Sequence, residues 1–198
     1  MDIPFFPPLF TTTAQKREFR AMIMRQIGCC LDVCISMDCL NDLQLFLQYE
    51  YFIIYSYMDG DQSYNLWRSM GDVMSSISAL GYHERLDGRL DTPEFLIQLR
   101  KTAFARIYSA DKNMALFLGR PLRMSKRFYH FHLPDTRPIS IQEMLPVDDT
   151  LGPHEWHPDS VIDYRSETRW SALCASIKED IMELLFDRSR TDRSSRVS

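Results

Sequence analysis

The chain has 198 residues, of which 45% are hydrophobic and 25% are charged, a balance typical of one folded globular domain. Its formal net charge of −4 argues against nucleic acid or an anionic membrane as a partner attracted by overall charge. It contains no uncharged apolar run of roughly eighteen residues, so no membrane span is predicted. The start, MDIPFFPPLF, lacks the basic and apolar regions of a signal peptide, and we therefore expect an intracellular protein.

Residues 1–13 are predicted to form a flexible N-terminal segment, because their prolines disfavour a helix. A first helix is expected from about residue 14 to residue 38, where apolar residues recur at steps of three and four. The residues of this stripe are Phe19, Ile23, Ile27, Cys30, Cys34 and Met37.

The cysteines indicate reduced thiols, because their number is odd and no C-x-x-C pair occurs. Cys30 and Cys34 share one face of the first helix, and we expect them to be buried there as small apolar side chains. A metal site is the alternative interpretation. The full set is Cys29, Cys30, Cys34, Cys39 and Cys174.

A second helix, from about residue 41 to residue 57, is apolar on nearly every face and is predicted to be the most buried. A turn at Gly60 follows, with Asp61 as the expected cap of a third helix over about residues 62–80. The apolar stripe of the third helix comprises Leu66, Trp67, Met70, Met74, Ile77 and Leu80.

A fourth helix is expected to begin with Thr92 (or Asp91) as its cap and Pro93 at its first position, and to end near Leu118. Its apolar residues step regularly by three and four, which is a strong helical pattern. They are Leu96, Leu99, Ala103, Ile107, Ala110, Met114 and Leu118.

Residues 119–160 contain six prolines and four of the five histidines, and are predicted to form a long loop. A fifth helix is expected over about residues 160–186, followed by a polar, disordered tail over 188–198. The expected core residues of the fifth helix are Trp170, Leu173, Ile177, Ile181 and Leu185.

No segment alternates convincingly with period two, so the sequence predicts an all-α fold. The expected architecture is an irregular helical domain of about five helices over residues 14–187, with a long proline-rich loop after the fourth helix.

Three patterns follow one another between residues 43 and 134. The first is a helix with small residues that leads into Leu80, Gly81, Tyr82 and His83. The second is the helix that carries Asp111 and leads into Gly119, Arg120 and Pro121, and the third is FHLPDTRP. In this order they resemble the fungal-specific transcription factor domain, the middle homology region of zinc-cluster (Zn2Cys6-type) factors, which closes on a Leu-Pro segment. The resemblance implies a structural signature made of Gly81, His83, Asp111, Gly119, Arg120 and Pro121.

The chain departs from the family in two places. Thr102, Ala103 and Phe104 follow its basic pair, where the family usually has one or two tryptophans. The six-cysteine zinc cluster that binds DNA in the family has no counterpart, because CCLDVCISMDC has a different spacing and few basic residues. We therefore predict no DNA-binding residues. Because no nucleophile-elbow, phosphate-loop or dinucleotide-binding pattern occurs either, we predict no catalytic residues, and we expect no metal or other cofactor in this chain.

The resemblance implies a regulatory region that acts in the nucleus on RNA polymerase II transcription. The implied partners are other transcription regulators or the rest of its own factor, and a small-molecule effector; neither specific DNA contact nor a membrane is expected. The alternatives are a stand-alone helical interaction scaffold and, with less support, a helical enzyme or a metal-binding protein. A metal site would draw on His130, His132, His154 and His157.

Arg120 raises a separate question, because a cation stands between Gly119 and Pro121 at the end of an apolar helix. We interpret it as a structural latch whose guanidinium turns back to the last carbonyls of the helix and toward Asp111. A ligand contact is the alternative.

Overall fold

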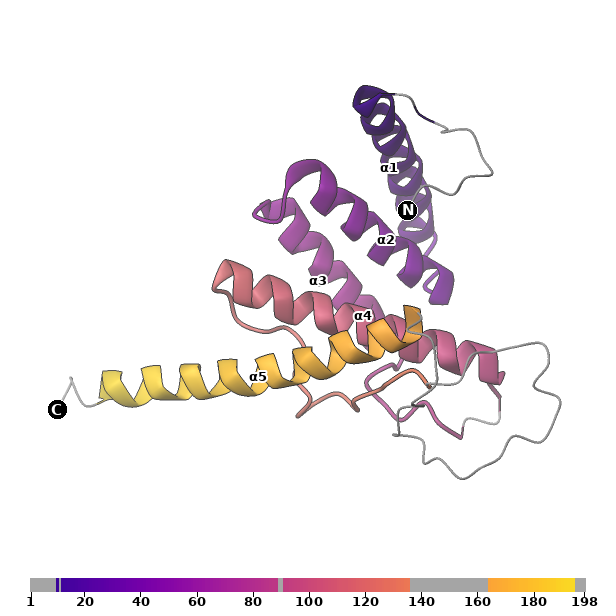
Figure 1. Ribbon diagram of the computed structural model, residues 1–198. Coiled ribbons are helices and arrows are strands. Elements are labelled where there is room, and N and C mark those ends of the chain that lie inside the picture. The colour runs from indigo at the N-terminus through magenta and orange to yellow at the C-terminus, as the bar shows by residue number, and fades with distance from the viewer. Residues whose placement is uncertain (1–9, 11, 89–90, 136–163, 195–198) are drawn as a thin grey trace. The chain divides into compact units, whose positions relative to one another are not determined.

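The computed structural model describes residues 10, 12–88, 91–135 and 164–194, the last eight of them as helical backbone only (Figure 1). The described residues contain five α-helices and no strand, which confirms the all-α prediction. The helices are α1 (Thr13–Ser36), α2 (Asp42–Asp59), α3 (Tyr64–Ala79), α4 (Glu94–Leu118) and α5 (Tyr164–Ser194). None of them is both long and apolar enough to cross a bilayer.

The chain divides into two compact units, residues 1–76 and residues 77–198, and the division falls inside α3. In the first unit α1 packs against α2, and in the second α4 packs against α5. The single regulatory domain proposed over residues 14–187 stays a prediction. Most of the proline-rich loop, residues 136–163, lies outside the described residues.

The helices of the first unit begin at residues whose side chains cap them. Thr12 and Gln15 form a reciprocal capping box at the start of α1. The Asn41 side chain accepts a hydrogen bond from the Gln44 amide at 3.0 Å at the start of α2. Asp61 is not the cap of α3: the helix begins at Tyr64, and the Trp67 amide bonds the Ser63 carbonyl.

The second unit corrects three predicted boundaries. α4 begins one residue later than expected, with Pro93 at the N-cap and its carbonyl accepting from the amides of Leu96 and Ile97. α5 begins at Tyr164, later than expected. It continues to Ser194, so the tail predicted to be disordered from residue 188 is mostly helical; arginine is a good helix former and does not end the helix.

The most deeply buried helix is not the one that the sequence predicted. α4, rather than α2, buries the most side chains, and Leu43 of α2 is 76% exposed. In α1 only Leu31 is buried, and Cys30 is exposed, contrary to its expected place in the core. Cys34 is half-buried. The predicted stripe of α3 is confirmed for Leu66, Met70, Met74 and Ile77, which are all buried.

Candidate functional site

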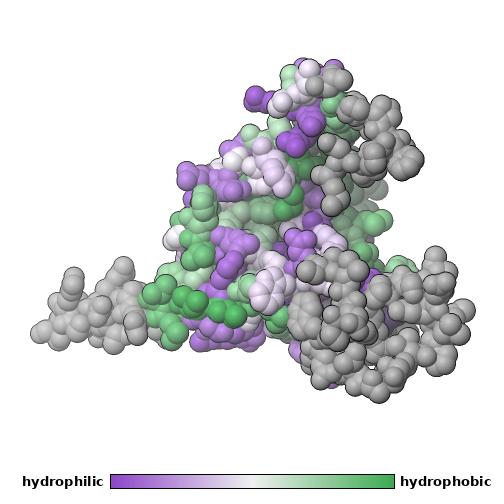
Figure 2. Space-filling model, in the orientation of Figure 1, coloured by the Kyte–Doolittle hydropathy of each residue, from purple (hydrophilic) through white to green (hydrophobic). Residues whose placement is uncertain are grey.

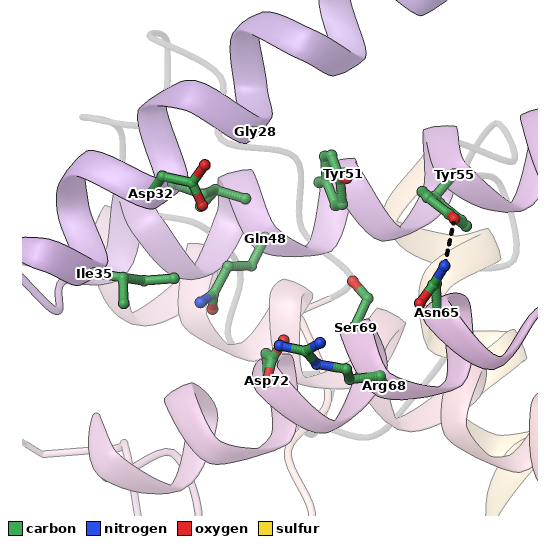
Figure 3. A pocket seen from close by; sticks show the side chains of 11 residues that line it. Gly28, Asp32, Ile35, Gln48, Tyr51, Tyr55, Asn65, Arg68, Ser69 and Asp72 are labelled. Atoms are coloured by element: carbon green, nitrogen blue, oxygen red, sulfur yellow. Dashed lines mark hydrogen bonds between the residues drawn. The ribbon is translucent and has the colours of Figure 1, made fainter.

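A pocket of about 370 Å³ opens in the first unit between α1, α2 and α3 (Figure 3). Each helix contributes residues spaced by three, four or seven positions, and such residues share one helix face. Its lining residues are Gly28, Leu31, Asp32 and Ile35 from α1, Gln48, Tyr51 and Tyr55 from α2, and Asn65, Arg68, Ser69 and Asp72 from α3.

The lining of the pocket is mostly polar. The Asn65 amide nitrogen donates to the Tyr55 hydroxyl at 3.3 Å. The Gln48 side chain is buried, and its Oε1 has no hydrogen-bond partner in the part of the chain that the structure describes. The pKa of Tyr51 is raised, first by burial and then by the nearby Tyr55 hydroxyl and Asp32 carboxylate. Both causes keep the Tyr51 hydroxyl in its neutral form.

A cluster of buried charges forms the centre of the second unit. The Lys112 ammonium lies 2.9 Å from a carboxylate oxygen of Asp111 and 3.3 Å from one of Glu179, and all three side chains are almost fully buried. The Tyr108 hydroxyl donates to the same Glu179 oxygen at 2.5 Å. Burial opposes ionisation of Glu179, but the bond from Tyr108 and the charge of Lys112 outweigh it and hold its pKa below the usual value.

This cluster fastens the segment that follows α4. Asp111 accepts from the backbone amides of Arg123 and Met124, at 3.3 and 3.0 Å, and Lys112 donates to the carbonyl of Met124. The second carboxylate oxygen of Glu179 accepts from the Lys126 amide at 2.8 Å. The segment after α4 is therefore held by the buried side chains of Asp111, Lys112 and Glu179, which bind its backbone.

The predicted pairing of Arg120 with Asp111 is not found, because the partners of that carboxylate are Lys112 and the two amides of Arg123 and Met124. The Arg120 backbone has a structural role instead: its amide bonds the Ala115 carbonyl at 3.0 Å and helps to end α4. The sequence drew attention to the arginine between Gly119 and Pro121, but the carboxylate of Asp111 is satisfied by Lys112 and by two main-chain amides.

The two glycines of the signature end helices. Gly119 has the left-handed φ of 63° at the end of α4, as predicted. Gly81, with φ of 75°, donates to the Ser78 carbonyl while the Tyr82 amide bonds the Ile77 carbonyl, which is the Schellman arrangement. Pro121 follows Gly119 at an exposed position.

The histidines in the described residues make backbone contacts. The His83 carbonyl accepts from the His130 amide at 2.9 Å, and the His83 ring meets the edge of Tyr129. His132 is 2% exposed, and its Nε2 lies 2.8 Å from the Glu84 carbonyl and 3.1 Å from that of Tyr82. Because carbonyl oxygens only accept hydrogen bonds, Nε2 carries the proton. A protonated ring nitrogen cannot bind a metal ion.

Only two of the four histidines considered as metal ligands lie within the described residues. His130 and His132 lie beside each other, with ring centroids 4.8 Å apart. His154 and His157 lie outside the described residues. Within residues 10, 12–88, 91–135 and 164–194, no group of three or more His, Cys, Asp or Glu side chains is arranged to hold a metal ion.

The apolar stripe predicted to face the core on α5 is mostly exposed instead. Trp170, Ile177, Ile181 and Leu185 are each at least half exposed, as is Leu184 beside them. Figure 2 shows apolar side chains along this part of α5. We call these five residues the α5 stripe. The face that is buried carries Ala172, Ala175, Glu179 and Met182. An exposed run of large apolar side chains is typical of a surface that binds a partner.

Comparison of the chain with protein-family models, with curated proteins and with solved structures found no match.

Proposed function

We propose that the chain is the regulatory region of a fungal transcription factor, acting in the nucleus on RNA polymerase II transcription. The order of the motifs from Gly81 to Pro134 supports the family, and all-α architecture agrees with it. In this proposal the chain has no catalytic activity and needs no cofactor. It acts by binding a partner or effector that favours one of two packing states.

The α5 stripe is the observation that carries the proposal. Burying a large apolar side chain contributes roughly 1.5–3 kcal/mol, so leaving several exposed on one helix is costly unless a partner covers them. The residues of the stripe are separated by seven, four and three positions from Trp170 through Ile177 and Ile181 to Leu184, which is the spacing of a helix that docks on another helix. The partner chemistry that fits is the apolar face of a helix, in a regulator or in the rest of the factor.

The second candidate is a stand-alone helical interaction scaffold, which the α5 stripe also favours. The two functions differ in what partner binding does. A regulatory region changes transcription when it is placed beside a DNA-binding domain, whereas a scaffold leaves transcription unchanged.

The test fuses the full chain to a heterologous DNA-binding domain and measures a reporter gene in a fungal cell. We expect the fusion to activate or repress the reporter relative to the DNA-binding domain alone. The double substitution Ile177→Asp and Leu184→Asp should abolish that effect while the protein level stays the same. Leu43→Asp is the matched control, because it places the same charge on an exposed leucine outside α5.

An inactive fusion that is expressed and located in the nucleus would contradict the regulatory function and favour the scaffold. An effect that survives the two α5 substitutions would contradict the role of the α5 stripe.

A further inference from the structure

The charges of the first-unit pocket are unbalanced. Asp72 and Arg68 lie four residues apart on α3, so they are neighbours on one helix face, and Asp32 is a second aspartate of the lining, on α1. Asp32 on α1 has no cation beside it in the pocket lining and takes part in no hydrogen bond or ion pair among the described residues. With two aspartates and one arginine, the pocket lining has a formal net charge of −1.

Two aromatic rings lie in the same pocket as this carboxylate. Tyr51 and Tyr55 have ring centroids 5.9 Å apart and are tilted by 43°. Figure 3 shows Tyr51 on α2, on the opposite side of the pocket from Asp32 on α1. Aromatic faces beside a carboxylate are the surroundings that a positively charged nitrogen prefers, because the ring faces and the carboxylate all attract a cation.

Gln48 supplies a buried acceptor that the protein leaves unpaired. Its side chain is 7% exposed and its Oε1 has no partner in the described part of the chain. A buried carbonyl oxygen without a hydrogen bond is unfavourable, because it has lost its water without gaining another donor. Because the last torsion of a glutamine side chain is soft, the amide can turn this oxygen into the pocket when a donor arrives. An N–H donor of a ligand would recover that cost.

We infer that this pocket binds a small organic amine in its ammonium form, with the nitrogen held by Asp32 and Gln48 and flanked by Tyr51 and Tyr55. The volume of about 370 Å³ lies at the lower end of small-molecule sites, which suits a ligand with one ring or a short chain. The inference names the chemical class of the effector and rests on the proposed function for its biological role.

The test uses three probes that share one ring and differ in charge: benzylamine, benzyl alcohol and benzoate. Each is titrated into the full chain at neutral pH and low salt, and binding is followed by saturation-transfer NMR. Benzylamine is expected to bind at least about tenfold more tightly than the other two, a difference of about 1.4 kcal/mol. Asp32→Asn should weaken benzylamine binding by about fivefold.

Asp61→Asn is the matched control, because it removes the same charge from an exposed position of the same unit that does not line the pocket. It should leave benzylamine binding unchanged. Circular dichroism confirms that each variant keeps its helices.

Equal binding of benzylamine and benzyl alcohol, tighter binding of benzoate, or unchanged binding in Asp32→Asn would each overturn the inference. The reporter assay is independent of this result. If the chain binds the amine but the reporter fusion is inactive, the amine site stands and the regulatory function is refuted. If the fusion is active but no amine binds, the regulatory function stands and the amine site is refuted.

Discussion

Gly28 and Gly119 differ in backbone conformation, and so in what a side chain would cost at each position. Gly28 lies inside α1 with a helical backbone, and a Cβ there would lie 3.9 Å from the nearest side-chain atom, Tyr51 Cε2. Gly119 has a left-handed φ of 63°, and a Cβ there would meet nothing within 4 Å. Space is therefore available at both positions, and only the backbone conformation separates them.

The two alanine substitutions should consequently have opposite effects. We expect Gly28→Ala to raise the free energy of unfolding by about 0.5–1 kcal/mol, because glycine is a poor helix former. Gly119→Ala should lower it by about 1 kcal/mol, because a side chain disfavours the left-handed region. Chemical denaturation of both variants measures this. A gain of stability in Gly119→Ala would contradict the assigned helix end.

His132 makes the stability of the fold depend on pH. Burial lowers its pKa from 6.5 to about 4, with a smaller contribution from His130, against the opposing bonds to backbone carbonyls and the charge of Asp87. Between those two values the unfolded chain binds a proton that the folded chain does not. Stability is therefore lost as the pH falls below about 6.5.

The expected loss between pH 7 and pH 5 is on the order of 2 kcal/mol from this residue. His132→Gln keeps a side-chain N–H donor but does not titrate, so its free energy of unfolding should change less over that range. His130→Gln should reduce the pH dependence only slightly, because the charge of His130 is a smaller cause of the lowered pKa of His132 than burial is. Equal pH dependence in wild type and His132→Gln would show that this imidazole is not held neutral.

At the scale of the helix, periodicity located the elements better than it located their buried faces. The apolar spacing predicted α1 to α4 to within about two residues at most ends, since it depends on neighbours along the chain. The buried face of α4, however, includes Lys101, Asp111 and Lys112. Charged side chains enter a core only where partners from distant segments neutralise them, and a local pattern does not contain that information.

The error on α5 has a different cause. Small side chains at Ala172 and Ala175 let α5 approach α4 closely, so this face is buried although its residues add little to an apolar count. The larger residues of the α5 stripe were assigned to the core because size and apolarity usually indicate burial. The alanine spacing was the signal that could have revealed the packed face.

A buried ion cluster joins α4, α5 and the segment after α4. Removing any one of its charges should lower the free energy of unfolding. Lys112→Met leaves the carboxylates of Asp111 and Glu179 without their cation, and we expect a loss of about 3–5 kcal/mol. Because Lys112 and Glu179 are direct partners, combining Lys112→Met with Glu179→Gln should cost at least about 1 kcal/mol less than the sum of the two changes. Urea denaturation of the four proteins gives this coupling.

Arg127→Met is the control for that cycle. Arg127 pairs with Glu183 of α5 at 2.9 Å, but its side chain is 69% exposed, so water screens the interaction. Its loss should cost less than about 1 kcal/mol. Strict additivity between Lys112 and Glu179 would mean that the buried pairing does not stabilise the fold.

For the whole molecule, the sequence predicted the fold class but not the places where side chains from several helices meet. The pocket needs Asp32, Gln48 and Arg68, and each of them reads as an ordinary polar residue of a solvated helix face. The signature glycines were predictable because their conformational role is local. The predicted pairing of Arg120 with Asp111 was wrong, because that carboxylate is held by Lys112 and by two backbone amides, and amides do not appear in a sequence pattern.

The charge of the whole chain is unfavourable for binding DNA. Its 23 basic residues are outnumbered by 27 acidic ones, and the zinc cluster of the resembled family has no counterpart in its cysteines. Neutralising several phosphates at once requires clustered Lys and Arg, so we expect no sequence-specific binding to duplex DNA at physiological salt. Fluorescence polarisation with a randomised pool of duplexes, followed by selection and sequencing, measures this. An enriched motif bound by the chain, with an affinity that falls steeply with salt, would contradict this prediction.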